Sequence, residues 1–204
     1  DRKRAVVDTV MVGPLGAAAL GGVGVGSMVH FNVAIFAYGL MYGLDTLVSQ
    51  AFGAKRHEDC KAALRQGLWL AIALAPVVML VIEVIGPRLD QTGIRPEVSE
   101  PAWSYLRVVN WSTLPLLVFG ALRRYMQSVG LVRQIMVTLL IANVLNALAN
   151  WILIHGAPGL GISALGVAGS AWATLLSRSF MMFGCLGFVL ARNRNIFLSR
   201  DGGF

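Results

Sequence analysis

The sequence has little charge, and most of that charge is positive. Only 13% of its 204 residues are charged and 56% are hydrophobic, whereas a soluble domain carries about 25% charged residues. The mean hydropathy is +0.69. Such an excess of apolar residues is not the composition of a large soluble core.

Cysteines and catalytic motifs are also scarce. Cys60 lies in a polar loop and Cys185 inside an apolar run, so no disulfide is expected. No H-E-x-x-H, paired C-x-x-C, P-loop or G-x-S-x-G motif occurs. His30 and His155 have no potential metal-ligating neighbour at a useful spacing and are interpreted as packing or interfacial residues. The sequence therefore predicts neither an enzyme nor a transition-metal centre.

Long apolar runs dominate what is present. Each can cross a bilayer, because a transmembrane helix needs roughly 20 mostly apolar residues. The runs do not alternate apolar and polar residues as barrel strands would, so we predict an all-α, polytopic membrane bundle. A shorter apolar segment within residues 5–21 is interpreted as the end of a preceding, partial helix. The predicted spans are approximately 23–49, 62–86, 102–127, 131–154 and 162–190.

The positive charges separate by loop. If the spans alternate in direction, ten basic residues fall on one side of the membrane and three on the other, which places the richer side in the cytoplasm together with the C-terminal tail. No basic stripe interleaves with aromatic residues, so nucleic acid is not an expected partner. The richer side carries Lys55, Arg56, Lys61, Arg65, Arg123, Arg124, Arg133, Arg192, Arg194 and Arg200; the other carries Arg88, Arg95 and Arg107.

Polar side chains recur on one face of the fourth span. Asn143, Asn146 and Asn150 share that face in an otherwise apolar helix. Amides are costly against lipid, so the row faces protein or a cavity. Spacing alone supports hydrogen bonding between helices and a ligand site about equally. In the fifth span Gly166, Ser170 and Thr174 recur at steps of four, a spacing that favours a packing seam over a site.

Two carboxylates are further candidates. Asp8 precedes a short apolar segment, and a carboxylate within a membrane suggests a proton carrier or cation ligand. The neighbouring Arg2, Lys3 and Arg4 leave a solvated terminal residue open as the alternative. Asp45 lies late in the first full span, where a structural capping role and a role in transport are both possible.

Four segments together resemble the N-terminal half of a multidrug and toxic compound extrusion (MATE) transporter, in order and over nearly the whole chain. The most specific piece is residues 49–54, which include Gln50, Gly53 and Ala54. It is more similar to the NorM-like and eukaryotic branches than to the DinF-like branch. The segments are VVDTVMVGPLG (6–16), YGLDTLVSQAFGAKR (42–56), NVLNALANWILIHG (143–156) and LGVAGSAWAT (165–174).

The resemblance implies a fold of twelve helices in two lobes. Residues 1–204 would form the N-terminal lobe, with the end of helix 1 and helices 2–6, and without the C-terminal lobe. The implied activity is outward transport of amphipathic, often cationic drugs, driven by inward flow of Na⁺ or H⁺. Its implied partners are a drug-like substrate, the lipid bilayer of a plasma (inner) membrane and the missing lobe, with no cofactor beyond the coupling ion.

The resemblance also implies a cation site. Asp8 matches the helix-1 aspartate of the family pattern, Asn146 and Asn150 match a polar pair on helix 5, and Thr174 matches a hydroxyl on helix 6. These side chains offer oxygen atoms, which suit a hard cation.

Two other functions remain open. One is a flippase of lipid-linked oligosaccharides or polysaccharides from the same superfamily, which should have several basic residues facing the cleft, whereas Arg178 is the only basic residue deep in a span. The other is a membrane scaffold that does not transport, in which Asp8 and the asparagine row serve packing alone.

Overall fold

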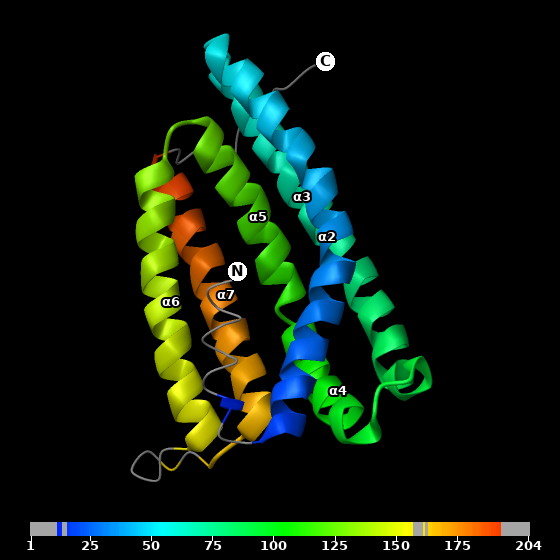
Figure 1. Cartoon of the computed structure of the whole chain (residues 1–204). Helices are drawn as coiled ribbons and strands as arrows, with labels where there is room; N and C mark the ends of the chain where they lie inside the picture. The colour runs from blue at the N-terminus through cyan, green and yellow to red at the C-terminus, as the bar shows by residue number, and fades with distance from the viewer. Residues whose placement is uncertain (1–11, 14–15, 157–160, 162, 193–204) are drawn as a thin grey trace.

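The computed structural model describes residues 12–13, 16–156, 161 and 163–192, and almost all of them are helical. The helices form an elongated bundle (Figure 1), and the all-α prediction is confirmed. The α-helices are α2 (Ala17–Gly53), α3 (His57–Ile85), α4 (Pro96–Asn110), α5 (Thr113–Ser128), α6 (Val132–His155) and α7 (Gly166–Arg192), and a 3₁₀ helix η2 (Gly86–Thr92) follows α3.

Helix length and hydropathy agree with the five predicted spans. In the described part of the chain, four helices are long and apolar enough to cross a membrane, and α4 with α5 forms a fifth, bent span. One boundary differs, because residues 17–21 were predicted in the partial first helix and belong to α2. The backbone of Gly16 has a φ of 104°, a value that interrupts a helix before the apolar run that continues into α2. The rest of the predicted segment 5–21 lies largely outside the described residues.

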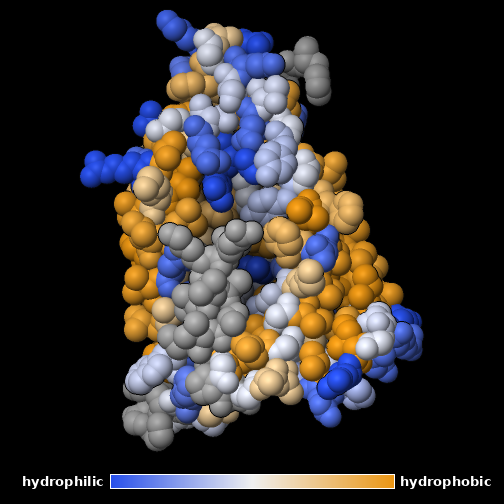
Figure 2. All heavy atoms as spheres, viewed as in Figure 1, coloured by the Kyte–Doolittle hydropathy of each residue, from blue (hydrophilic) through white to orange (hydrophobic). Residues whose placement is uncertain are grey.

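The outer surface of the bundle is apolar. Phe36 is 80% exposed, and many other large hydrophobic side chains on α2, α3, α6 and α7 are also exposed. Figure 2 shows these apolar side chains along both flanks of the bundle, with polar residues gathered at its ends. Such apolar flanks are suited to contact with lipid rather than with water. The fold is therefore that of a multi-pass membrane protein.

Glycines allow α2 to approach α4 closely. A Cβ at Gly22 would lie 2.5 Å from the Cβ of Pro101, and a Cβ at Gly26 would lie 2.8 Å from Cδ1 of Tyr105. This G-x-x-x-G pair therefore fixes a helix crossing. The second pair with that spacing, Gly39 and Gly43, has no neighbour that a Cβ would meet.

The helix pair α4 and α5 is broken at its centre, where the two helices meet at 54°. Pro115 lies in the first turn of α5. Proline has no N–H to donate to the carbonyl four residues earlier, and its ring clashes with that carbonyl. Apolar residues on both sides of the break, such as Val109 and Leu116, belong to the hydrophobic cluster around Met41 and Leu106. The later part of α5 packs into a second cluster around Leu64 and Leu122.

Candidate functional site

The two predicted polar rows lie on helices that pack together. A Cβ at Gly169 of α7 would lie 2.5 Å from the carbonyl oxygen of Leu153 on α6. Further along, the hydroxyl of Ser177 donates to the carbonyl of Ala142, at 3.0 Å. Between these two contacts the antiparallel helices bring Asn146 level with Thr174, and Asn150 level with Ser170.

These four side chains are buried. Asn150 and Ser170 are 0% exposed, Asn146 is 1% exposed and Thr174 is 6% exposed. The predictions that Asn146, Asn150 and Thr174 are hidden from lipid therefore agree with the structure. Asn143, the third asparagine of the row, is only partly buried.

Three polar atoms of this group are unsatisfied. Within the described residues, Nδ2 of Asn146, Oγ of Ser170 and Oγ1 of Thr174 have no hydrogen-bond partner. A buried polar group without a partner costs about 1–3 kcal/mol. Such groups are uncommon in native proteins and point to a missing ion, water or side chain. We call Asn146, Asn150, Ser170 and Thr174 the α6–α7 polar cluster.

The hydrogen bond of Asn146 does not connect two helices. Its Oδ1 accepts a hydrogen bond from Nδ2 of Asn150, at 3.3 Å, and both residues belong to α6. The α6–α7 pair is joined instead by the bond from Ser177 to Ala142. The hypothesis that Asn146 is interhelical glue thus gains no support from its contacts with described residues.

Asp8, the predicted carboxylate of the site, lies outside the described residues. The nearest described side chain after it is Val12, which is fully buried. Val12 belongs to a cluster that also contains Ile154 of α6 and Ala171 of α7.

The family motif residues Gln50, Gly53 and Ala54 lie apart from the polar cluster. All three are exposed, at the C-terminal end of α2. There the N–H of Ala54 donates to the carbonyl of Gln50, at 3.0 Å, and closes the last turn of the helix. This end of α2 and the junction of α6 with α7 lie at opposite ends of the bundle (Figure 1).

Asp45 forms an ion pair that sequence reasoning did not identify. Its Oδ2 accepts from Nη1 of Arg124 on α5, at 2.9 Å. The same guanidinium lies over the ring of Tyr42, 3.9 Å from its centroid. Asp45 therefore joins α2 to α5, a structural role that differs from the cap considered above.

The break between α4 and α5 carries a second polar network, which the sequence reading missed. His30, interpreted from the sequence as a packing or interfacial residue, lies well inside α2 and is buried, as the packing alternative expects. Its Nε2 lies 3.2 Å from Oγ1 of Thr113, whose own hydroxyl is 3.5 Å from Oδ1 of Asn110. A Ser-Thr pair shortly before Pro115 is the sequence signal that could have identified this site.

Arg178, the deep basic residue of the fifth predicted span, also reaches this break. Its Nη1 donates to Oγ of Ser112, at 2.6 Å. Arg178 and Thr174 are one helical turn apart on α7, so the break is linked to the helix that carries half of the polar cluster.

The α6–α7 polar cluster offers oxygen atoms as ligands. Two hydroxyls and the carbonyl oxygens of two amides could coordinate a hard cation such as Na⁺. No group of three or more His, Cys, Asp or Glu side chains suited to a metal ion occurs among the residues that the structure describes.

Comparison with known proteins places this all-helical membrane bundle among transporters. The MatE family matches residues 4–152, which is most of the chain, and the chain belongs to this family. It is a family of transporters rather than enzymes. The chain is 31% identical over 189 residues to a probable multidrug resistance protein NorM of Mesorhizobium japonicum. It is 32% identical over 191 residues to the protein of the same name in Geobacillus kaustophilus.

Those matches cover 92% and 93% of this chain but only 40% and 41% of the relatives. The chain thus spans about two fifths of their length. Among solved structures, a eukaryotic MATE transporter superposes with a TM-score of 0.83 at 20% identity, over 96% of this chain and 42% of that one. The inward-facing conformation of a multidrug resistance MATE family transporter gives 0.80 at 22% identity, over 97% and 42%. At these identities the structures support the fold alone.

Proposed function

We propose that this chain is the cation-binding lobe of a secondary active multidrug transporter, which exchanges amphipathic or cationic compounds for Na⁺ or H⁺. The observation that carries the proposal is the α6–α7 polar cluster, which is buried, rich in oxygen and incompletely hydrogen-bonded. The name that its NorM relatives bear, multidrug resistance protein, favours the same activity.

In this proposal the hydroxyl of Thr174 and the amide oxygens of Asn146 and Asn150 coordinate the cation. Oδ1 of Asn146 can face the cation while it accepts from Nδ2 of Asn150, because an amide oxygen has two lone pairs. Asp8 supplies the negative charge, either as a ligand of Na⁺ or as the carrier of a proton. Val12, which follows Asp8 in the chain, is buried in a hydrophobic cluster that also includes Ile154 of α6 and Ala171 of α7, and this supports the inclusion of Asp8 in the site.

The remaining parts of the proposal concern the whole transporter. Residues 1–204 form one N-terminal lobe, and a C-terminal lobe provides the opposite wall of the drug cleft. The lobe is embedded in a plasma (inner) membrane, with the loop between α2 and α3 and the C-terminal tail in the cytoplasm. The distribution of positive charge supports this orientation.

Neither alternative function gains support from the structure. A flippase needs basic side chains available to a pyrophosphate, whereas the guanidinium of Arg178 donates to Ser112. A scaffold needs the polar row for packing between helices, whereas the described hydrogen bond of Asn146 stays within α6.

Cation binding by the purified chain in lipid nanodiscs tests the proposal. Radioactive sodium retention reports Na⁺, and proton uptake after a pH jump reports H⁺. Thr174→Val keeps the shape of the side chain and removes the hydroxyl, so we expect at least tenfold weaker Na⁺ retention. Asp8→Asn should abolish proton uptake.

Thr138→Val is the matched control. Thr138 is also a buried threonine, but its hydroxyl already donates to the carbonyl of Gln134, at 2.9 Å. We expect this variant to bind the cation like the unmodified chain. Equal binding by the Thr174 and Thr138 variants, or no binding of either cation by the unmodified chain, would contradict the proposed site.

A further inference from the structure

A groove between α4 and α7 contains two opposite charges without ion-pair partners. Its volume is about 710 Å³, and it is lined by polar and aromatic side chains of α4 and by Trp172 and Leu175 of α7. Within the described chain, neither Glu100 nor Arg107 takes part in an ion pair. Both residues lie on α4, the first half of a bent helix pair that with α5 is long and apolar enough to cross a membrane, and charges without partners are costly inside a membrane. The groove therefore suits an occupant that brings charges of its own.

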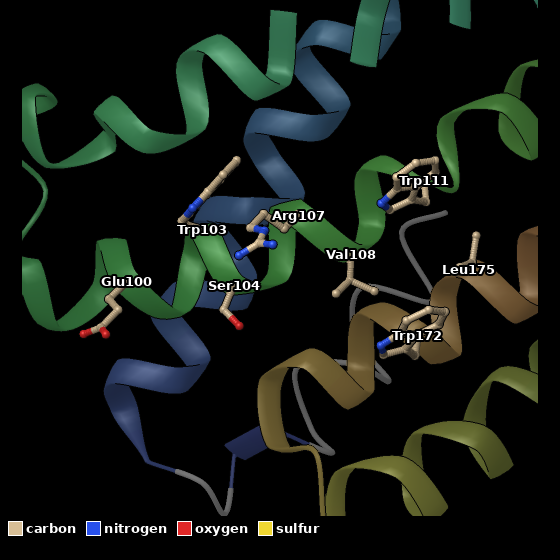
Figure 3. Close-up of a pocket in the computed structure, with 8 residues that line it drawn as sticks. All are labelled: Glu100, Trp103, Ser104, Arg107, Val108, Trp111, Trp172 and Leu175. Atoms are coloured by element: carbon tan, nitrogen blue, oxygen red, sulfur yellow. The ribbon is translucent and has the colours of Figure 1, made fainter. Parts of the chain in front are cut away.

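The two charges are spaced along the axis of α4. Glu100, Ser104 and Arg107 lie in a row on the exposed face of α4 (Figure 3). Seven residues of helix separate the Cα atoms of Glu100 and Arg107 by about 10 Å. Glu100 is nearer the start of α4, which follows the charged turn at 86–95, and Arg107 lies deeper. The side chain of Arg107 leans toward the start of its helix, and so toward the membrane surface.

Aromatic side chains form the deeper walls of the groove. Trp111 is 67% exposed and Trp172 is 44% exposed, and they lie on its two sides (Figure 3). Trp103 is held over Gly86, because a Cβ at that glycine would lie 2.1 Å from Cζ3 of the indole. Indoles suit the region where lipid headgroups meet acyl chains.

From the start of α4 toward α5, the groove thus presents the carboxylate of Glu100, the guanidinium of Arg107 and then the indoles of Trp111 and Trp172, with Trp103 near the carboxylate end. An ethanolamine phospholipid presents an ammonium, a phosphate and then acyl chains in the same direction. We propose that this groove binds a phospholipid with an ethanolamine headgroup, with its ammonium on Glu100 and its phosphate on Arg107. An anionic phospholipid without an amine would meet repulsion from Glu100.

Fluorescence quenching by brominated lipids tests this site in vesicles. Replacing Trp69 and Trp151 with Phe leaves only the three groove tryptophans, since the chain has five. Dibrominated phosphatidylethanolamine or phosphatidylglycerol is then diluted into unbrominated phosphatidylcholine. We expect half-maximal quenching at a mole fraction at least threefold lower for the ethanolamine lipid.

The two charge variants have different expected outcomes. Arg107→Gln should weaken quenching by both lipids, whereas Glu100→Gln should weaken quenching by the ethanolamine lipid and strengthen quenching by the glycerol lipid. Glu97→Gln and Arg95→Gln, which alter nearby charges outside the groove, are the controls and should keep the original preference. Circular dichroism of every variant checks that the bundle has folded.

Non-specific contact with surrounding lipid predicts a different result. The two brominated lipids would then quench the unmodified chain at equal mole fractions, or their difference would persist in both the Arg107 and Glu100 variants. Either result would overturn the proposal. The test does not depend on cation binding, so it can fail or succeed independently of the transport function proposed above.

Discussion

Buried serine and threonine hydroxyls in the described part of this bundle differ in whether they have a hydrogen-bond partner. Those of Thr138, Ser112 and Ser177 donate to backbone carbonyls, as buried hydroxyls in helices usually do. Those of Ser170 and Thr174 have no partner within the described residues. The difference separates hydroxyls that stabilise the fold from hydroxyls available to an ion.

The ion pair between Asp45 and Arg124 is, like the hydrogen-bonded hydroxyls, a contact that stabilises the fold. Both side chains are partly exposed, so its contribution to stability should be modest, about 1 kcal/mol. We expect Asp45→Asn to lower the free energy of unfolding by about that amount without weakening cation binding. Thermal melting in detergent, with exposed Arg133→Gln as control, measures the effect. A loss of cation binding in the Asp45 variant would show that this carboxylate does more than join α2 to α5.

Single residues were predicted well where the sequence pattern was unusual. Three asparagines on one face of an apolar helix could be identified from spacing alone, and two of them are fully buried. The pairing of Asp45 with Arg124 joins residues 79 positions apart, and no local pattern reveals it. The contact of His30 with Thr113 was missed for a similar reason, because the two residues are 83 positions apart.

At the scale of helices, the contact between α6 and α7 holds the polar cluster together. Gly169 permits that contact, because any Cβ there would collide with the backbone of Leu153. We expect Gly169→Ala to separate the helices, to cost about 1–3 kcal/mol of stability and to weaken cation binding.

Gly187→Ala on the same helix is the control, since a Cβ there meets no neighbour. Melting temperature and cation retention, measured on both variants, check the expectation. Equal behaviour of the two would mean that the cluster does not depend on this close approach.

The helical character of the chain could be predicted, because long apolar runs without alternation favour helices over barrel strands. Two element boundaries were harder to predict. The break near Pro115 places a 54° bend within one predicted span, and proline indicates where a helix is interrupted but not the angle of the bend. The start of α2 depends on the backbone of Gly16, whose φ value the sequence does not reveal.

At the scale of the molecule, the chain spans about two fifths of the length of its NorM relatives. In the function proposed above, this chain is one lobe, and the opposite wall of the cleft belongs to a second lobe. We therefore expect this chain alone, in vesicles with an inward Na⁺ or H⁺ gradient, to give no cation-driven efflux of a fluorescent dye. Measurable coupled efflux would contradict the division into a cation-binding lobe and a second lobe.

Melting of the chain with and without cation tests the central claim most directly. If the α6–α7 polar cluster is a cation site, Thr174→Val removes an unsatisfied group and should raise the melting temperature in cation-free buffer. The same variant should lose the stabilisation that saturating cation gives the unmodified chain, about 2.7 kcal/mol at a hundredfold excess over Kd. A variant that melts lower without cation, yet is still stabilised by Na⁺ and by acid as the unmodified chain is, would show that the cluster serves packing alone.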